Sequence, residues 1–224
     1  PGESLWMKLR SPQVVRFHKF NETKDSHQYY YSVMQLYLPH ESEEDLFPEN
    51  SHECHKLYLS QKERMDHAIS SVIEKGAYIL QEELVHFENK LAEYTNSKYA
   101  IGVANGTDAI WLALLAADIG TGDEVIVPSH TYIASPAAIK FVGAEPILAE
   151  CGDDHLLDPN DIEKRITKKT KAIMPVQLNG RTCDMNKIID IAKKNNLLII
   201  EDSAQGLGSL YRNKMAGTFG LAGT

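Results

Sequence analysis

The sequence predicts an α/β fold in which helices flank a mostly parallel β-sheet. From about residue 61 onward, short apolar runs alternate with helical segments of about 10–15 residues. This alternation is typical of right-handed βαβ units, whose parallel strands are buried on both faces. The clearest strand is Leu197–Glu201, an apolar run that ends in the acids Glu201 and Asp202. Such a sheet binds ligands beyond the carboxyl ends of its strands, so the residues after each strand are the site candidates.

The individual elements follow from local spacing and from the residues that end them. The segment 82–94 carries apolar side chains at helical spacing. Asp158 and Pro159 form a typical helix start, with the aspartate as N-cap and the proline at the first helical position. In chain order, the predicted helices are 65–75, 82–94, 107–117, 132–142, a helix from 159 onward and 184–195, and the predicted strands are 99–103, 124–128, 146–149, 171–176 and 197–201.

Composition and charge narrow the possible functions. The 224 residues are 43% hydrophobic and 24% charged, as in soluble globular proteins. The formal net charge of −8 argues against nucleic acid or an anionic membrane as a partner. No apolar run is long enough to span a bilayer, and the polar start at Pro1 is unlike a signal peptide. Three widely spaced cysteines, Cys54, Cys151 and Cys183, favour a reducing, cytoplasmic compartment over a disulfide framework.

Residue usage changes abruptly near residue 60. The first 60 residues contain nine of the eighteen aromatic residues but one of the fourteen glycines, and the first alanine is Ala68. This change predicts an N-terminal extension of separate origin over 1–60 and an α/β domain over 61–224. An extension with a local bias in composition is the alternative. Within it, 14–20 and 29–39 are expected to form short strands, or one strand and a helix.

These two segments and the acidic turn Glu41–Leu46 resemble part of the replication-helicase polyproteins of Helitron-type transposons, over residues 8–59. The resemblance implies no activity, because the chain contains no Gly-rich phosphate loop of the G-x-x-x-x-G-K-[ST] type. His52, Cys54 and His55 stand close together, but no second ligand pair lies at a zinc-site spacing. No metal site is therefore expected.

The first candidate strand end leads into the helix at 107–117. Gly106 permits a tight turn there. The N–H groups of Thr107, Asp108 and Ala109 at the helix N-terminus, together with the Thr107 hydroxyl, are expected to form a cup for a phosphate. Simple helix capping by Thr107 is the alternative.

The other candidate strand ends carry an aromatic ring, an acid and an amide. Tyr132 lies where a ring could stack on a flat heterocycle, with a place in the core as the alternative. Adjacent strand residues face opposite ways, so only one of Glu201 and Asp202 meets a ligand, and Asp202 is nearer the tip. Gln205 could then donate a hydrogen bond to a phenolic oxygen. A capped strand end with a surface acid pair is the alternative.

One ligand that needs a single acid at a strand tip is pyridoxal phosphate (PLP). Its pyridine nitrogen must stay protonated for the ring to accept electrons, and an adjacent carboxylate favours the protonated form. A phosphate cup, a stacking ring and an acid on successive strand ends of one sheet together predict a PLP site.

Residues 63–224 resemble the N-terminal part of the large domain of the DegT/DnrJ/EryC1/StrS sugar aminotransferases, which have the type I fold of PLP-dependent transferases. The matching motifs, in order, are Gly106–Ala109, Gly122–Tyr132, Gly143–Pro146, Asp184–Met185 and Glu201–Gln205. The resemblance implies that Gly106, Thr107 and Asp108 hold the cofactor phosphate and that Tyr132 stacks on the ring. It also implies that Asp202 pairs with the pyridine nitrogen and that Gln205 faces the 3-hydroxyl group.

The resemblance further implies a reaction and partners. Members of this family transfer an amino group from glutamate to a nucleotide-linked keto sugar, which predicts a nucleotide-sugar substrate, an amino-acid donor and a homodimer with its site at the subunit interface. The products feed polysaccharide, lipopolysaccharide or antibiotic sugars.

Two departures from the family pattern qualify this expectation. Gln177–Gly180 stands where the family often has His-Leu-Tyr-Gly, which affects the choice of substrate. The lysine that holds the cofactor covalently would follow a few residues beyond Thr224. The chain is therefore expected to be a truncated large domain that is inactive alone. A PLP-dependent sugar 3-dehydratase, with histidine in place of that lysine, and a non-enzymatic transposon-fusion product are the alternatives.

Overall fold

The computed structural model describes residues 5–9, 13–17, 35–37, 49–76 and 78–224, with side chains from His55 onward. These residues divide into two compact units, Pro1–Tyr78 and Ile79–Thr224. In the described part of the chain, no helix combines the length and apolar character needed to cross a bilayer.

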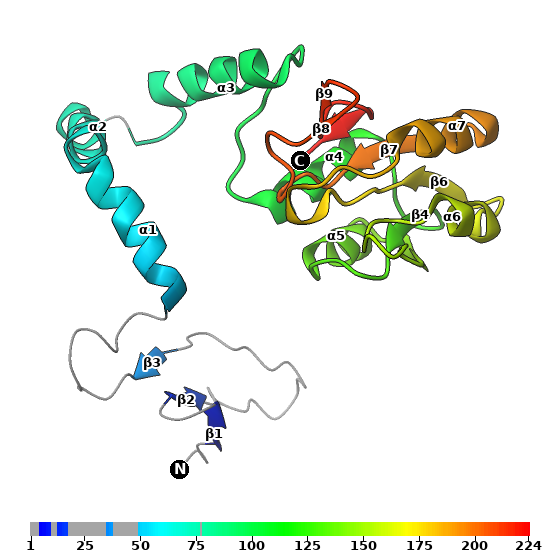
Figure 1. Cartoon of the computed structure of the whole chain (residues 1–224), viewed down its shortest axis with the longest axis horizontal. Coiled ribbons are helices and arrows are strands. Elements are labelled where there is room, and N and C mark those ends of the chain that lie inside the picture. Colours follow the sequence, from blue (N-terminus) through cyan, green and yellow to red (C-terminus); the bar gives the residue numbers. More distant parts are fainter. Residues whose placement is uncertain (1–4, 10–12, 18–34, 38–48, 77) are drawn as a thin grey trace. The chain divides into compact units, whose positions relative to one another are not determined.

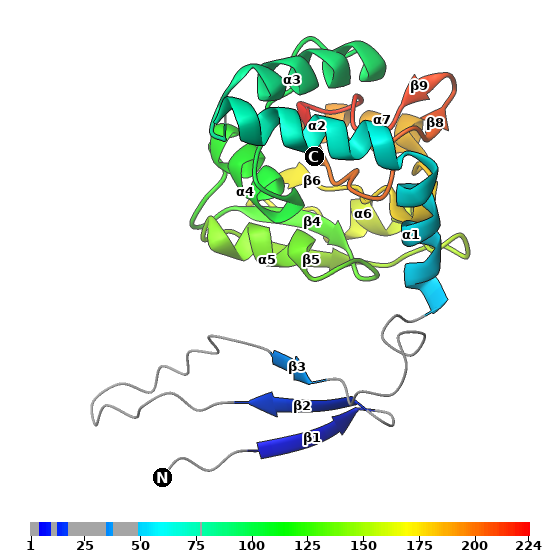
Figure 2. The ribbon, with the colours of Figure 1, turned by 90° about the vertical axis from the view of Figure 1, so that its left-hand side faces the viewer.

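The N-terminal unit contains a small antiparallel sheet and two helices. The sheet has the order β1 (Leu5–Leu9), β2 (Gln13–Phe17) and β3 (Gln35–Tyr37), and Figure 2 shows the three strands side by side. Two predicted segments, 14–20 and 29–39, overlap β2 and β3, and their remaining residues lie outside the described ones. The helices are α1 (Glu49–Ser60) and α2 (Lys62–Lys75), so the helix predicted at 65–75 begins earlier, at Lys62.

The C-terminal unit is built on a parallel sheet (Figure 1), as predicted. The five strands have the order β10-β7-β6-β4-β5, and every neighbouring pair is parallel. Their bounds are β4 (Glu124–Pro128), β5 (Glu145–Ala149), β6 (Thr170–Ile173), β7 (Leu198–Glu201) and β10 (Ala222–Gly223). The edge strand β10 and the hairpin of β8 (Leu210–Tyr211) and β9 (Lys214–Met215) were not expected from the sequence.

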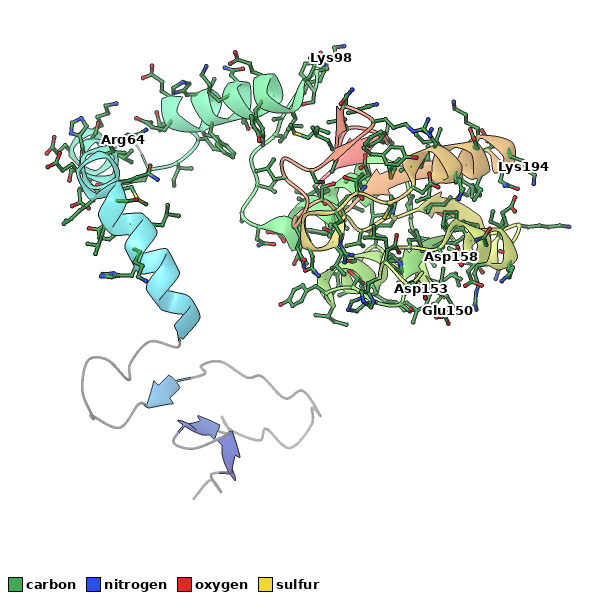
Figure 3. The ribbon with its side chains drawn as sticks, viewed as in Figure 1. Arg64, Lys98, Glu150, Asp153, Asp158 and Lys194 are labelled. Carbon is green, nitrogen blue, oxygen red and sulfur yellow. The ribbon has the colours of Figure 1, made fainter. Side chains whose placement is uncertain are left out.

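Helices cover both faces of this sheet. The α-helices of the unit are α3 (Glu82–Thr95), α4 (Gly106–Ala116), α5 (Ala134–Phe141), α6 (Pro159–Arg165) and α7 (Met185–Asn195). One core cluster joins Ile110 of α4 and Ile139 of α5 to the sheet, and a second joins Ile162 of α6 and Ile188 of α7. Lys194 of α7, labelled in Figure 3, pairs with Glu163 of α6 at 2.9 Å. The inner strands β4, β6 and β7 are therefore mostly buried on both faces, which explains their apolar sequences.

The strand predicted at 99–103 is wrong. This segment has no regular secondary structure, and 82% of Ile101 is exposed. No strand of the sheet pairs with it, and the N–H of Gly102 donates instead to a carboxylate oxygen of Glu88 at 2.7 Å. Apolar residues favour a strand only where a neighbouring strand can accept their backbone hydrogen bonds, and here that neighbour is absent from the described part of the chain.

The strand predicted at 171–176 is shorter than expected. β6 ends at Ile173, and a single bridge between Val176 and Asp202 continues the pairing with β7. Pro175 interrupts the ladder because it has no N–H group, although its carbonyl still accepts the N–H of Asp202 at 3.0 Å. The end of β7 is thus held against the segment that follows β6.

Candidate functional site

A cavity of about 230 Å³ opens at the carboxyl ends of β4, β6 and β7. Ten residues line it, namely Gly106, Thr107, Ile110, Thr131, Tyr132, Ala134, Val176, Asp202, Ala204 and Gln205. The cavity brings together five of the six residues that the sequence analysis selected for a cofactor. Asp108 is the sixth, and it is not among the lining residues. Thr107 and Asp202, which are far apart in the sequence, therefore line the same cavity in the fold.

The wall formed by the N-terminus of α4 depends on a cap that the sequence analysis missed. The Asn105 side chain is the N-cap, and its Oδ1 accepts the N–H of Asp108 at 2.9 Å. Its Nδ2 donates to the Asp108 carboxylate at 3.0 Å, and its carbonyl accepts the N–H of Ala109 at 3.0 Å. The alternative of capping by Thr107 is wrong, because asparagine fills that role.

The same cap changes which groups can bind an anion. The N–H groups of Asp108 and Ala109 were expected to be free, but both donate to Asn105. The N–H groups of Gly106 and Thr107 and the Thr107 hydroxyl have no hydrogen-bond partner in the described part of the chain. These three donors stand at the positive end of the helix dipole and face the cavity from two lining residues.

Gly106 does not make the tight turn that the sequence analysis expected. It is the first residue of α4, and its φ is not positive. A Cβ added to Gly106 would lie 3.8 Å from the Cβ of Ala204, which is ordinary van der Waals contact. Gly106 and Ala204, both small, line the cavity side by side.

Strand alternation separates the two acids at the end of β7. Ile199 belongs to the core cluster under α6 and α7, and Ile200 belongs to the cluster under α4 and α5. Glu201 therefore faces the α6 and α7 side, and Asp202 faces the opposite side, where the cavity lies. This separation agrees with the selection of Asp202 as the acid that meets a ligand.

Glu201 has a structural role. It is fully buried, and its carboxylate accepts the N–H groups of Gly217 at 2.8 Å, Phe219 at 2.6 Å and Gly220 at 3.0 Å. The side-chain amide of Gln177 donates a fourth hydrogen bond at 2.9 Å. Both oxygens of Glu201 are thus used in holding the loop between β9 and β10, and none of these partners lines the cavity.

Asp202 is also buried, with 6% of its surface exposed, but it lines the cavity. Its Oδ2 accepts the hydroxyl of Ser135 at 2.6 Å, and its Oδ1 accepts the N–H of Ala204 at 3.3 Å. Ser135 lies on α5, 67 residues away in the chain. Ser135 was not predicted, because no local pattern indicates that a serine in a helix faces this carboxylate.

Gln205 and Tyr132 complete the polar and aromatic lining. The Oε1 of Gln205 accepts the N–H of Asn179 at 3.1 Å, which leaves its amide NH2 group as a donor. Tyr132 is 69% exposed, so its alternative place in the core is wrong. A flat ring held between these walls would therefore meet an aromatic face and an amide donor.

The segment Gln177–Gly180 is built into the fold. Gln177 is fully buried, and its Oε1 accepts the N–H of Cys183 at 2.8 Å. Burial, together with the negative charges of Asp154 and Glu201, raises the pKa of the Cys183 thiol to about 12. The predicted influence of this segment on the choice of substrate stays a prediction.

Several acidic residues lie on the surface of the loop between β5 and α6. Glu150, Asp153 and Asp158 lie along the loop between β5 and α6, and Figure 3 labels all three. In the described part of the chain, no three His, Cys, Asp or Glu side chains are arranged to hold a metal ion. The side chains of His52 and Cys54 lie outside the described ones.

An acid at the tip of a parallel strand, facing free donors at a helix N-terminus, is typical of α/β proteins that bind a phosphorylated cofactor. The chain belongs to the DegT/DnrJ/EryC1/StrS aminotransferase family, which matches residues 59–224. The match begins near the predicted boundary between the extension and the α/β domain. The resemblance of residues 8–59 to Helitron proteins stays a prediction.

Two curated relatives act on sugars linked to different nucleotides. A dTDP-3-amino-3,6-dideoxy-alpha-D-galactopyranose transaminase of Aneurinibacillus thermoaerophilus is 49% identical over 75% of this chain and 46% of its own length. A GDP-perosamine synthase of Escherichia coli O157:H7 is 48% identical over 71% of this chain and 43% of its own length. The chain thus spans less than half the length of either relative.

Solved structures share the fold and part of the sequence. DesV of S. venezuelae matches with a TM-score of 0.71 and 44% identity, over 73% of this chain and 44% of that chain. NtdA of Bacillus subtilis, solved with bound cofactor PMP, matches with a TM-score of 0.67 and 35% identity, over 70% of this chain and 37% of that chain. These likenesses confirm the predicted fold class.

Proposed function

We propose that this chain binds pyridoxal 5'-phosphate in the cavity at the carboxyl ends of β4, β6 and β7. The observation that carries the proposal is the cavity itself, because it combines the free donors of Gly106 and Thr107 with the carboxylate of Asp202. A phosphate and a protonated ring nitrogen are the two charged ends of this cofactor, and these groups match them in charge.

In this proposal each lining residue has one task. The N–H groups of Gly106 and Thr107 and the Thr107 hydroxyl hold the phosphate at the start of α4. Asp202 pairs with the pyridine nitrogen and keeps it protonated. Tyr132 stacks on the ring, and the NH2 group of Gln205 donates to the 3-hydroxyl oxygen.

Asp108 supports the phosphate site indirectly. Its N–H and its carboxylate both bond to Asn105, so it stabilises the cap and is not expected to touch the phosphate. A carboxylate in direct contact with a phosphate would also repel it. We therefore propose that Asp108 stabilises the start of α4 and does not bind the cofactor.

The cofactor, when bound, supplies an electron sink for amino-group transfer. We propose that the reaction is the transfer of an amino group, with glutamate as donor, to a keto sugar carried by a nucleotide. The names of the dTDP-sugar and GDP-sugar relatives support the substrate class. Because those relatives extend well beyond the match, the complete reaction, a homodimeric assembly and a cytoplasmic location are all proposals.

Binding of pyridoxamine phosphate (PMP) tests the cofactor proposal. PMP is the suitable probe because, unlike PLP, it does not react covalently with surface lysines. We expect saturable binding of one PMP per chain by calorimetry, weakened at least tenfold by Asp202→Ala and by Thr107→Val, because each removes a charge-assisted contact.

The matched control is Thr182→Val, which removes a hydroxyl from a Thr–Ser pair that does not line the cavity. PMP affinity should be unchanged in this variant. If Asp202→Ala and Thr107→Val also bind PMP as the wild-type chain does, the assignment of the cavity to this cofactor is wrong.

A further inference from the structure

The hydrogen bond between Ser135 and Asp202 joins helix α5 to the residue that follows strand β7. Ser135 lies in the first turn of α5 and is fully buried. Its Oγ is 2.6 Å from Oδ2 of Asp202, in a contact between two buried side chains. A short bond from a buried hydroxyl to a carboxylate is of the stronger, charge-assisted kind.

The direction of this bond follows from the chemistry of the partners. An ionised carboxylate can only accept, so the single hydroxyl hydrogen of Ser135 points to Asp202. The Tyr132 carbonyl, at 3.3 Å, is a more distant and neutral acceptor for the same hydrogen. The lone pairs of Ser135 Oγ are then free to accept the hydroxyl of Thr131, which lies 2.8 Å away. The order of donation is Thr131 to Ser135 to Asp202.

The two oxygens of Asp202 are held from different directions. Oδ2 is held by Ser135 of α5, and Oδ1 by the N–H of Ala204, two residues later in the chain. The second bond is long, at 3.3 Å, so the Ser135 bond is the stronger restraint on rotation of the carboxylate. Without it, one buried oxygen would lose its protein donor and the group could turn away from the cavity.

We infer that Ser135, supported by Thr131, is a positioning residue that sets the rotation of the Asp202 carboxylate toward the cofactor ring nitrogen. This inference rests on the proposed function. Ser135 does not line the cavity, so it acts through Asp202 and does not touch the cofactor. Thr131 does line the cavity, and its hydroxyl is turned to Ser135.

The test measures the charge state of the bound ring, which a purely structural role would leave unchanged. PMP labelled with 15N at the pyridine nitrogen reports protonation through its NMR chemical shift as the pH is raised. In Ser135→Ala we expect the ring nitrogen to lose its proton about one pH unit lower than in the wild type, because the turned carboxylate stabilises the protonated form less. Affinity for PMP should fall about tenfold.

Thr131→Val is the second variant, since it removes the outer hydroxyl and leaves the Ser135–Asp202 bond in place. We expect a downward shift smaller than that of Ser135→Ala, and this variant decides the question if Ser135→Ala does not fold. Thr182→Val is the control and should titrate as the wild type does.

The outcomes separate this inference from the function on which it rests. If Asp202→Ala weakens PMP binding but the serine and threonine variants titrate as the wild type does, the positioning role is wrong and the cofactor site stands. If the wild-type chain does not bind PMP in the cavity, the proposed function fails first.

Discussion

The end of β7 and the start of α4 both line one cavity, but they are stabilised in different ways. At the start of α4, Asn105 bonds to Asp108 and Ala109, which are three and four residues away, and the side chain is exposed. At the end of β7, Glu201 and Asp202 are buried, and all but one of their side-chain hydrogen bonds, the bond from Ala204 to Asp202, come from residues between 16 and 67 positions away. Local contacts thus make one wall and long-range contacts make the other.

This difference separates the two tasks of a cofactor site. An anion at a helix start needs backbone donors that the cap leaves unpaired, such as the N–H groups of Gly106 and Thr107. An acid that pairs with one ring nitrogen needs a defined rotation, and only side chains packed from another element can set it. We therefore expect the buried groups around the end of β7 to be strongly protected from solvent and their substitution to lower stability markedly. Substitution of the α4 cap should lower stability only slightly.

The largest expected effect is the slow alkylation of the Cys183 thiol, which is buried in the core cluster that contains Ile199 of β7. Its pKa is raised from an ordinary value of 9.0 to about 12, because burial disfavours the charged thiolate. At pH 8 the thiolate is therefore about a thousandfold rarer in the folded chain than in the unfolded one, so alkylation by iodoacetamide should slow by about that factor. Peptide mapping by mass spectrometry measures this, with the half-buried Cys151 as reference. Equal labelling of both cysteines would mean that solvent reaches the core around Cys183, and the predicted protection would be wrong.

The next effect concerns Glu201→Gln. The amide NH2 group of the new side chain would face N–H donors that the carboxylate accepts now. We expect the free energy of unfolding to fall by about 3 kcal/mol, as for other buried charged groups that lose their hydrogen bonds. Urea unfolding followed by circular dichroism measures the change.

Glu145→Gln is the control for that substitution, because Glu145 forms an exposed pair with Lys140. The expected loss is below about 1 kcal/mol, as for surface ion pairs. If the two variants lose equal stability, the buried carboxylate does not anchor the loop between β9 and β10.

The smallest effect concerns the cap of α4. Asn105→Ala removes the side chain that accepts the N–H of Asp108, and we expect a loss of about 1 kcal/mol in the free energy of unfolding. Asn105→Ser keeps an N-cap acceptor and should recover most of that loss. A loss as large as that of Glu201→Gln would show that this wall, too, depends on long-range contacts.

Much of the fold follows from short segments of sequence. The N-caps Asp158 and Asp184 stand at the starts of α6 and α7, and the apolar runs at 124–128 and 197–201 form β4 and β7. Caps and apolar runs act within a few residues, so the sequence displays them directly. The predicted strand at 99–103 failed because strand formation depends on a neighbour elsewhere in the chain.

The candidate site divides in the same way. The motifs around Thr107, Tyr132 and Asp202 indicated which residues would line a cavity, because strand ends of a parallel sheet meet at one edge. The cap at Asn105, the structural role of Glu201 and the contact of Ser135 were not predicted. Each depends on which partner lies within hydrogen-bonding distance, and this cannot be inferred from the sequence pattern.

The amino-acid sequence alone determined the helices α2 to α7, four strands of the parallel sheet and the edge at which polar residues gather, since periodicity and caps are local properties. The tertiary structure decided which hydroxyl orients Asp202. That choice depends on packing between α5 and β7, where atoms 67 residues apart come within 2.6 Å.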